Sequence, residues 1–414
     1  MTTEAHMTLI NEHYLNLSGS YLFSEIARRV KEFAAADPRI GLLRLGIGDV
    51  VRPLVPAVVE ALRKAVDEQG TNEGFRGYGP EQGYDFLRAA VVGDWYKDLG
   101  IAPEEVFIGD GSKCDVGNFQ ELFGEGCRPA LTDPVYPVYA DSNVMAGRGG
   151  PQRADGSFDG LILLPATFEN GFSPDFPTER PDFIYICSPN NPTGTAMDRK
   201  TLTAWVEYAR KNESIILFDA AYEAYIRTPD VPHSIYEIPG ARETAVEFRS
   251  YSKTAGFTGL RCSVAIVPKA LHGTTSTGER ISIRDLWLRR QTTKYNGCPY
   301  ITQRAAEAVH TPEGRTQCAA LVAEYLENAG IVRRAFEELG LEAVGGRDAP
   351  YVWVKLPDGV KSWDFFDLLL HKAGIVGTPG VGFGPHGEGC FRFSGFGSRE
   401  NILAAVERVR KMVL

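Results

Sequence analysis

Little in this sequence would direct the chain to a membrane or to nucleic acid. No apolar run approaches the roughly 18 residues of a membrane-spanning helix, and residues 215–218 are typical of the longest runs. The first residues contain neither the basic nor the apolar segment of a signal peptide. Positive charge is in deficit, with 44 Lys and Arg against 53 Asp and Glu, so no general attraction to nucleic acid or anionic lipid is expected. We therefore expect a cytoplasmic protein that binds neither and that holds any anionic ligand with local cations.

Cysteine is scarce as well. The seven cysteines are an odd number and form no Cys-x-x-Cys pair, which favours reduced thiols over disulfides and makes a zinc site unexpected. The 44 glycines and 25 prolines fall far short of a collagen-like or low-complexity chain. Hydrophobic residues make up 43% of the 414 residues, so the chain can form the packed cores of two or three domains.

Short apolar strands alternate with helices through the middle of the chain. We expect strands at residues 106–108, 161–164, 183–187, 215–218, 245–248 and 264–267. A helical apolar pattern at residues 202–209 lies between two of these strands. Such alternation, with uninterrupted apolar strands, is typical of an α/β fold whose mostly parallel sheet is covered on both faces.

Further elements are predicted on either side of this block. Ahead of it, apolar spacing indicates helices at residues 24–36, 56–66 and 87–99. After it, we expect a helix at 321–339, strands near 352–354 and 391–393, helices at 363–372 and 399–412, and a glycine-rich loop at 377–389. This second block is typical of a smaller α+β domain. We therefore divide the chain into an N-terminal arm with part of the small domain (1–49), a large domain (50–297) and a small C-terminal domain (298–414).

The segment FRSYSKTAGFTGLR carries the greatest density of chemically useful residues. An expected strand ends just before Ser250, Ser252 and Lys253, and Arg261 follows two glycines. The hydroxyls and the guanidinium could together bind a phosphate, and the glycines would let the backbone approach it. An amine beside a phosphate anchor is what a Schiff base with pyridoxal 5′-phosphate (PLP) requires. A solvated basic loop is the alternative.

Asp219 follows an apolar strand directly, so it lies where ligands of open α/β sheets bind, at a strand's carboxyl end. A carboxylate there can keep a pyridine nitrogen protonated. An ion pair at ~4 Å is worth about 4 kcal/mol at an effective dielectric constant near 20, or about three pKa units. The alternative is an aspartate that caps the next helix.

Four more motifs could complete a site, and each also has a purely structural interpretation. The turn SPNNPTG could set the Asn191 amide against a ring hydroxyl, and GDGSK lies where a helix N-terminus binds anions. Tyr136 could stack on an aromatic ring. Arg392, between two phenylalanines, suits a bidentate carboxylate clamp. A tight turn, a core tyrosine or a solvated arginine would explain each one alone, but their joint order along the chain is more specific.

That order resembles the fold-type I PLP-dependent aminotransferases. The Asn-Pro-x-Gly turn, the strand-end Asp-x-x-Tyr, the Ser-x-Ser-Lys loop and the late arginine are marks of this family. Longer stretches, such as RGYGPEQGY, TDPVYPVY, CSPNNPTG and TKYNG, extend the resemblance from about residue 11 to 400 and towards the branch that acts on LL-diaminopimelate. The resemblance implies a seven-stranded type of large-domain sheet, PLP as cofactor, and a homodimer with shared active sites. It also implies small amino-acid and 2-oxo-acid substrates.

The resemblance further implies a role for individual residues. Lys253 matches the lysine that binds the cofactor covalently, and Asp219 matches the partner of the pyridine nitrogen. Tyr136 matches the aromatic ring that stacks on the cofactor. Two residues match partners of its ring oxygen: Tyr222 and Asn191. The residues that match positions around the phosphate are Ser112, Lys113, Ser250, Ser252 and Arg261, together with Tyr78 and Asn296 from the neighbouring subunit.

Substrate recognition is implied in the same way. Arg392 matches the clamp for the α-carboxylate, and the carboxylate of Glu81 suits a distal ammonium. The other residues that match substrate-binding positions are Tyr21, Gly48, Lys113, Tyr136, Asn191 and Asn296. Small departures, such as Tyr251 where phenylalanine is commoner, remove no reacting group.

Two other functions remain open at this stage. An aminotransferase for aspartate, alanine or an aromatic amino acid would share the chemical residues and differ only at the rim of the site. A protein that merely binds the cofactor is the second alternative, but it would not need the proton-transferring amine of Lys253.

Overall fold

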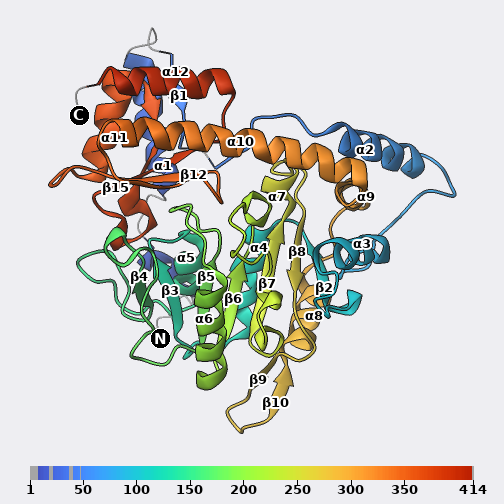
Figure 1. Ribbon diagram of the computed structural model, residues 1–414. Helices are drawn as coiled ribbons and strands as arrows, with labels where there is room; N and C mark the ends of the chain where they lie inside the picture. Colours follow the sequence, from blue (N-terminus) through green and yellow to red (C-terminus); the bar gives the residue numbers. More distant parts are fainter. Residues whose placement is uncertain (1–7, 18–21, 37–40, 47, 413–414) are drawn as a thin grey trace, which may run out of the picture.

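The computed structural model describes residues 8–17, 22–36, 41–46 and 48–412 and is built around a seven-stranded sheet (Figure 1). The strand order is β2-β8-β7-β6-β5-β3-β4. The bounds are β2 (Val106–Gly109), β3 (Pro129–Asp133), β4 (Ile162–Pro165), β5 (Phe183–Cys187), β6 (Ile215–Asp219), β7 (Ala245–Ser250) and β8 (Ser263–Ile266). β8 runs antiparallel to both of its neighbours, and all other pairs are parallel. The predicted mostly parallel sheet is confirmed.

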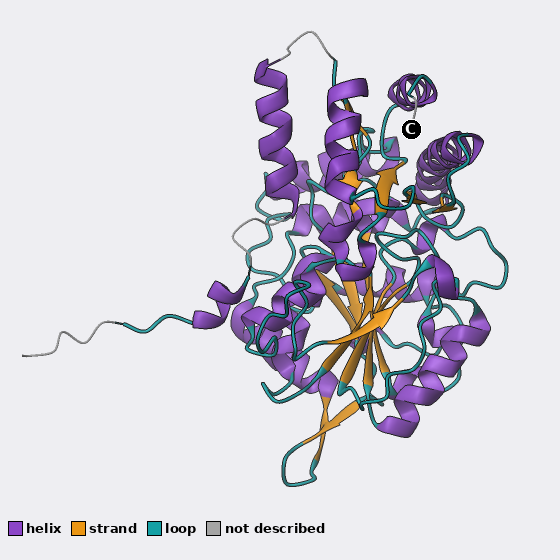
Figure 2. Cartoon of the chain, turned by 90° about the vertical axis from the view of Figure 1, so that its left-hand side faces the viewer, coloured by secondary structure: helices purple, strands orange, loops and turns teal. Residues whose placement is uncertain are grey.

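Side chains of the central strands alternate between two cores, one on each face of the sheet. On β5, Ile184 and Ile186 belong to one core, and Phe183 and Tyr185 belong to the other. The first core is covered by α2 (Pro56–Gln69), α3 (Asp85–Trp95), α6 (Arg199–Asn212) and α9 (Tyr300–Val309). The second is covered by α4 (Ser112–Phe119), α5 (Val138–Met145) and α8 (Ile283–Lys294). Figure 2 shows helices on both sides of the strands, and this double cover explains why the strands are apolar throughout.

A second, smaller sheet has the antiparallel order β11-β12-β15-β14. Its strands are β11 (Ala343–Gly345), β12 (Tyr351–Lys355), β14 (Thr378–Pro379) and β15 (Cys390–Ser394). It shares a core with α1 (Leu22–Ala36), α10 (Pro312–Glu338), α11 (Ser362–Ala373) and α12 (Arg399–Arg410). Beside it, β1 (Leu43–Arg44) pairs in parallel with β13 (Ile375–Val376), so the N-terminal and C-terminal regions share this part of the fold. The expected α+β arrangement is confirmed.

Several predicted boundaries are wrong. The helix expected at 87–99 ends at Trp95, because Tyr96 leaves the helical conformation (φ −123°), and its hydroxyl donates to the buried Glu247. The helix expected at 321–339 begins at Pro312. Val66, assigned to an apolar helix face, is 55% exposed, and its neighbour Ala65 is buried instead. The structure also contains elements that were not expected, among them β3, α5, α8, α9 and a hairpin of β9 (His272–Thr274) and β10 (Arg280–Ser282). Within the described ranges, no helix has the length and apolarity needed to cross a membrane.

Candidate active site

A cavity of about 340 Å³ lies at the carboxyl ends of β5, β6 and β7 and beside the N-terminus of α4. Tyr351 of β12 and Arg392 of β15 line it from the smaller sheet. Parallel strands place their carboxyl ends at one edge of a sheet, and ligands bind there. Twelve of the residues predicted from the sequence line this cavity: Gly48, Ser112, Lys113, Tyr136, Asn191, Asp219, Tyr222, Ser250, Ser252, Lys253, Arg261 and Arg392.

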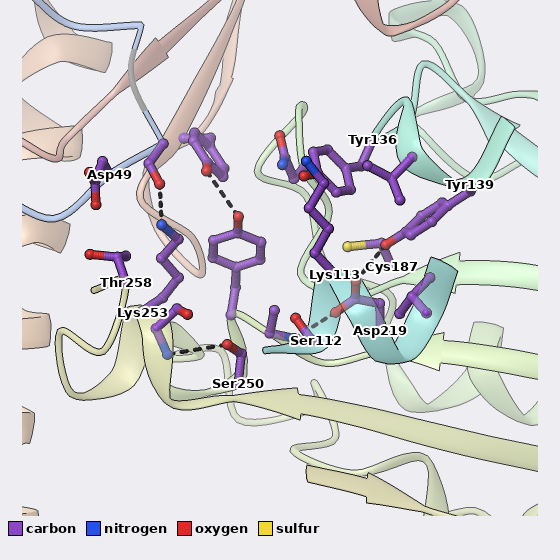
Figure 3. Close-up of a pocket in the computed structure, with 18 of the residues that line it drawn as sticks. Asp49, Ser112, Lys113, Tyr136, Tyr139, Cys187, Asp219, Ser250, Lys253 and Thr258 are labelled. Atoms are coloured by element: carbon purple, nitrogen blue, oxygen red, sulfur yellow. Dashed lines mark hydrogen bonds between the residues drawn. The ribbon is translucent and has the colours of Figure 1, made fainter. Parts of the chain in front are cut away.

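Lys253 lies on α7 (Tyr251–Thr254), a single turn that follows β7 directly. The Ser250 hydroxyl caps this turn by accepting from the backbone N–H of Ser252 at 3.1 Å. The Lys253 amine donates to the carbonyl oxygen of Gly48 (Figure 3). Burial lowers the pKa of Lys253 to about 8, against a smaller opposing effect of Asp49. About a tenth of the amine is therefore unprotonated at pH 7, far more than for an ordinary lysine, and the unprotonated form is what a nucleophile or proton acceptor requires.

Asp219 is buried at the end of β6, and Figure 3 shows it beside Tyr139 and Cys187. Its Oδ2 accepts from the Tyr139 hydroxyl at 2.6 Å, and its Oδ1 accepts from the Ala221 N–H at 3.0 Å. Burial raises the pKa of Asp219, and these two hydrogen bonds oppose that rise. In the described part of the chain, no basic side chain pairs with Asp219. The carboxylate therefore suits a ligand that brings a cationic N–H.

The N-terminus of α4 forms one wall of an anion-binding cradle. Gly111 has φ +133°, and a Cβ atom there would overlap the guanidinium of Arg261, so only glycine leaves room for both. The Arg261 guanidinium donates to the Ser252 hydroxyl at 3.4 Å. The hydroxyls of Ser112 and Ser250 line the same cavity. Hydroxyls, a guanidinium and helix N–H groups together form a site suited to a phosphate.

Arg392 is buried on β15 and its guanidinium is held from several sides. Nη1 donates to Asn191 Oδ1 at 2.6 Å, and Nη2 donates to the Gly46 carbonyl at 2.7 Å. The guanidinium carbon lies 4.5 Å from the centre of the Tyr351 ring and 4.7 Å from the centre of the Phe383 ring. Because Asn191 accepts through its oxygen, its NH₂ group can donate into the cavity. This arrangement fits a planar carboxylate at Arg392 and a ring oxygen at Asn191.

The sequence analysis missed two tyrosines of this site, Tyr139 and Tyr351. Tyr139 lies in the first turn of α5 and contacts Tyr136, which precedes that helix, edge-to-face at 5.9 Å. The hydroxyl of Tyr351 forms a hydrogen bond with the hydroxyl of Tyr222, 129 residues away in the sequence. No local sequence pattern predicts such a contact.

Three further predicted residues, Tyr78, Glu81 and Asn296, do not line this cavity. Tyr78 is 92% exposed, Asn296 is exposed and Glu81 is half-buried. The two segments that carry them are adjacent, since a Cβ atom at Gly297 would lie 3.0 Å from the Pro80 carbonyl oxygen. Tyr21 lies outside the described residues. The described part of the chain also contains no cluster of His, Cys, Asp and Glu side chains that could hold a metal ion.

Comparisons with known proteins all find aminotransferases or proteins of similar structure. The family model "Aminotransferase class I and II" matches residues 40–409. The LL-diaminopimelate aminotransferase of Lawsonia intracellularis is 55% identical over 410 residues, which cover 99% of this chain and 100% of that protein. The L,L-diaminopimelate aminotransferase structure from Chlamydomonas reinhardtii has a TM-score of 0.92 and 46% identity over 98% of both chains. Substrate-bound BacF from Bacillus subtilis has a TM-score of 0.81 and 27% identity, also over 98% of both chains.

Proposed function

The chain belongs to the class I and II aminotransferase family, and on that premise we propose that it transfers an amino group from LL-diaminopimelate to 2-oxoglutarate. The products would be tetrahydrodipicolinate, formed when the oxo acid cyclises, and glutamate, in a step of lysine and diaminopimelate biosynthesis. The observation that carries the proposal is 55% identity to an LL-diaminopimelate aminotransferase over nearly the whole of both chains. We place the reaction in the cytoplasm, because all seven cysteines are free thiols.

The cavity fits PLP as the cofactor. The buried Asp219 has two hydrogen-bond donors but no cationic partner among the described residues, and a protonated pyridine nitrogen would supply one. The cradle of Gly111, Arg261 and the serine hydroxyls fits the phosphate. When bound, PLP would supply an aldehyde within reach of the Lys253 amine and a ring that withdraws electrons from the substrate.

Each residue then has a defined part in a two-step exchange. Arg392 binds the substrate α-carboxylate through its two-pronged guanidinium and fixes the orientation of the α-carbon. Lys253 Nζ would take the proton from that carbon, and its lowered pKa suits proton exchange near neutral pH. Asp219 would hold a proton on the ring nitrogen of bound PLP. Tyr222 and Asn191 would donate to its ring oxygen, and Tyr136 would pack against its ring.

Two residues assigned to the substrate, Glu81 and Asn296, do not line this cavity. We assign Glu81 to the distal ammonium and Tyr21, Gly48 and Asn296 to the rest of the diaminopimelate. Tyr78 and Asn296 would reach the site of a second subunit, so the active form would be a homodimer with two shared sites. The exposure of Tyr78 and its nearness to the Gly297 segment support this assignment.

The test is a half-reaction of the cofactor-loaded protein with one amino donor at a time. LL-diaminopimelate should shift the cofactor absorbance, which lies between roughly 360 and 430 nm, faster than aspartate, alanine or phenylalanine does. A faster shift with one of those three would reject the proposed substrate and retain an aminotransferase of another specificity. Borohydride reduction followed by peptide mapping should place the cofactor on Lys253, and an unmodified Lys253 would reject the cofactor assignment.

A further inference from the structure

Tyr351 reaches the cavity from the small sheet and contacts three residues of the proposed site. Its hydroxyl lies 2.9 Å from the hydroxyl of Tyr222, and the two rings meet edge-to-face at 5.2 Å. Its ring faces the Arg392 guanidinium. A Cβ atom at Gly48 would come within 2.8 Å of its hydroxyl oxygen, so glycine at position 48 leaves the space that this hydroxyl occupies.

We propose that Tyr351 is a positioning residue that links the carboxylate clamp of Arg392 to the ring-oxygen donor Tyr222. This inference rests on the proposed function, because it concerns how two residues of that site are held. Tyr351 comes from the small sheet and Tyr222 from the loop after β6 of the large sheet, so the link spans the two sheets.

The hydroxyl of Tyr351 sets the direction of the hydrogen bond that Tyr222 makes. Both side chains are buried, with 1% exposure for Tyr351 and 6% for Tyr222. A tyrosine hydroxyl has one proton to donate. When Tyr222 donates that proton to the cofactor's ring oxygen, it accepts from Tyr351. Donors arranged in such a chain polarise one another in a low-dielectric interior, so Tyr351 strengthens the donation from Tyr222.

The ring of Tyr351 acts on Arg392. Tyr351 pairs with Ser394 in the β12–β15 register, and Arg392 lies two residues before Ser394. Diagonal neighbours of this kind share one face of a sheet and are within reach of long side chains. Together with the Phe383 ring, whose centre lies 4.7 Å from the same guanidinium carbon, the Tyr351 ring restricts the orientation of the guanidinium and therefore the direction in which its N–H groups point. The hydroxyl and the ring thus have separate effects that separate substitutions can measure.

The hydroxyl is tested by titrating the absorbance of the cofactor-loaded protein against pH. A stronger donor at the ring oxygen stabilises its negative charge and so favours loss of the proton from the nitrogen that joins Lys253 to the cofactor. Tyr351→Phe should therefore raise the pH at which half of that nitrogen has lost its proton, which is the midpoint of the absorbance titration. The rise should be about half a pH unit if one neutral hydrogen bond is lost. Tyr222→Phe should raise it further, and Tyr351→Phe combined with Tyr222→Phe should match Tyr222→Phe alone, because the effect of Tyr351 acts through Tyr222.

The ring is tested with the pair Tyr351→Phe and Tyr351→Leu. Only the second removes the aromatic face, so it alone should weaken binding of 2-oxoglutarate, by about tenfold. Tyr236→Phe is the matched control, because its buried hydroxyl donates to Ala245 and Ile266 carbonyls at the other end of the sheet. That control should lose stability without moving the midpoint or the 2-oxoglutarate affinity.

The outcomes separate this inference from the function on which it rests. A wild-type protein whose Lys253 does not bind the cofactor would overturn both. If the wild-type cofactor titrates as expected but Tyr351→Phe has the same titration midpoint as wild type, the proposed link through the Tyr351 hydroxyl is overturned and the proposed function is not. Additive midpoint shifts in the double variant would also overturn it, since Tyr351 would then act independently of Tyr222.

Discussion

Burial holds two ionisable side chains of the cavity away from their usual protonation equilibria. It lowers the pKa of Lys253 to about 8 and raises the pKa of Asp219. Each shift costs folding stability in the absence of a partner. The lowered pKa of Lys253 suits the proposed chemistry directly, whereas Asp219 needs the cationic ring nitrogen as a partner to stay ionised. An amine that is partly unprotonated can attack an aldehyde, and a buried carboxylate binds a cationic ring nitrogen more strongly than an exposed one would. The two pKa shifts therefore have opposite directions, and each leads to its own prediction.

The Lys253 amine should set the pH dependence of cofactor attachment. Only the unprotonated amine attacks, so the attachment rate to cofactor-free protein should rise with pH around a midpoint near 8, far below the usual lysine value of 10.5. Asp49→Asn should lower the midpoint, because the negative charge of Asp49 favours the protonated amine. Stopped-flow absorbance would measure the rate, with a free alkylamine as control for the cofactor's own ionisations. A midpoint near 10.5 would contradict the burial argument.

Asp219→Asn should lower activity without lowering the stability of the cofactor-free protein at pH 7. Loss of an ion pair worth about 4 kcal/mol predicts a fall in the half-reaction rate of about 10³-fold. The effect on cofactor-free protein has the opposite sign. A carboxyl whose pKa is raised by folding weakens the folded state as pH rises from its unfolded to its folded pKa. Urea unfolding should find the variant at least as stable as wild type at pH 7, with the difference vanishing in acid. A destabilised variant at pH 7 would contradict this.

At the scale of elements, the short turn α7 is anchored by a buried chain of hydrogen bonds. The Tyr251 hydroxyl lies 2.6 Å from His310 Nε2, and His310 Nδ1 lies 2.9 Å from Asp94 Oδ2. Tyr251 begins α7, His310 caps α9 and Asp94 lies on α3. Tyr251, which departs from the commoner phenylalanine, therefore joins the segment that bears Lys253 to two helices of the large-sheet core.

Tyr251→Phe should cost about 1 kcal/mol of unfolding free energy, the net value of one hydrogen bond. His310→Ala should cost more, because it leaves both the Tyr251 hydroxyl and the Asp94 carboxylate without their histidine partner in a largely buried environment. Urea denaturation measures both effects. The half-reaction rate of Tyr251→Phe should stay within a few-fold of wild type, because the Tyr251 side chain does not line the cavity. A larger loss of stability in Tyr251→Phe than in His310→Ala would rule out this chain as the anchor.

The N-terminus of α4 gives a second element-scale prediction. Gly111→Ala should displace the Arg261 guanidinium, and loss of a charge-assisted bond of about 1.5–3 kcal/mol predicts cofactor binding weaker by roughly 10- to 100-fold. Equilibrium dialysis with PLP measures the effect. Pyridoxal, which lacks the phosphate, is the control ligand, and its affinity should change little. An equal loss for both ligands would mean that the substitution damages the fold rather than the phosphate cradle.

Sequence patterns predicted the central strands because β5 is a continuous apolar run followed by Ser188, and β6 is an apolar run that ends in Asp219. The strand β3, which is PALTD, lacks such a run and is defined by its pairing with β4 and β5. The same distinction applies to the cavity. Asp219 and Arg392 stand out locally as charges at the end or centre of a largely apolar strand, and Lys253 stands out in the serine-rich turn that follows β7. Tyr351 does not, because its partner Tyr222 is 129 residues away, and only the packing of the two sheets brings them together.

At the scale of the whole molecule, one surface carries predicted site residues that do not line the cavity of their own chain. The segments of Tyr78 and Gly297 adjoin each other there. Phe75 is 65% exposed and lies three residues before Tyr78, itself 92% exposed. Exposed aromatic residues beside predicted site residues are typical of a contact with another protein. If one such segment contacts the other subunit's cavity, two-fold symmetry makes the contact reciprocal, so both cavities would be completed in the same way.

Complementation between two inactive variants should test this sharing of sites. Lys253→Ala removes the amine from its own cavity, and Tyr78→Ala combined with Asn296→Ala removes the residues proposed to act in the partner's cavity. In a hybrid dimer of the two variants, one cavity carries both defects and the other carries none. Random assortment of co-expressed chains makes half of the dimers hybrids with one intact site, so about a quarter of wild-type activity should return. Tagging the two chains differently allows the hybrid to be purified and assayed alone, where half of wild-type activity is expected. If Tyr78 and Asn296 instead served their own chain, the hybrid would carry one defect in each cavity and would be no more active than its parents.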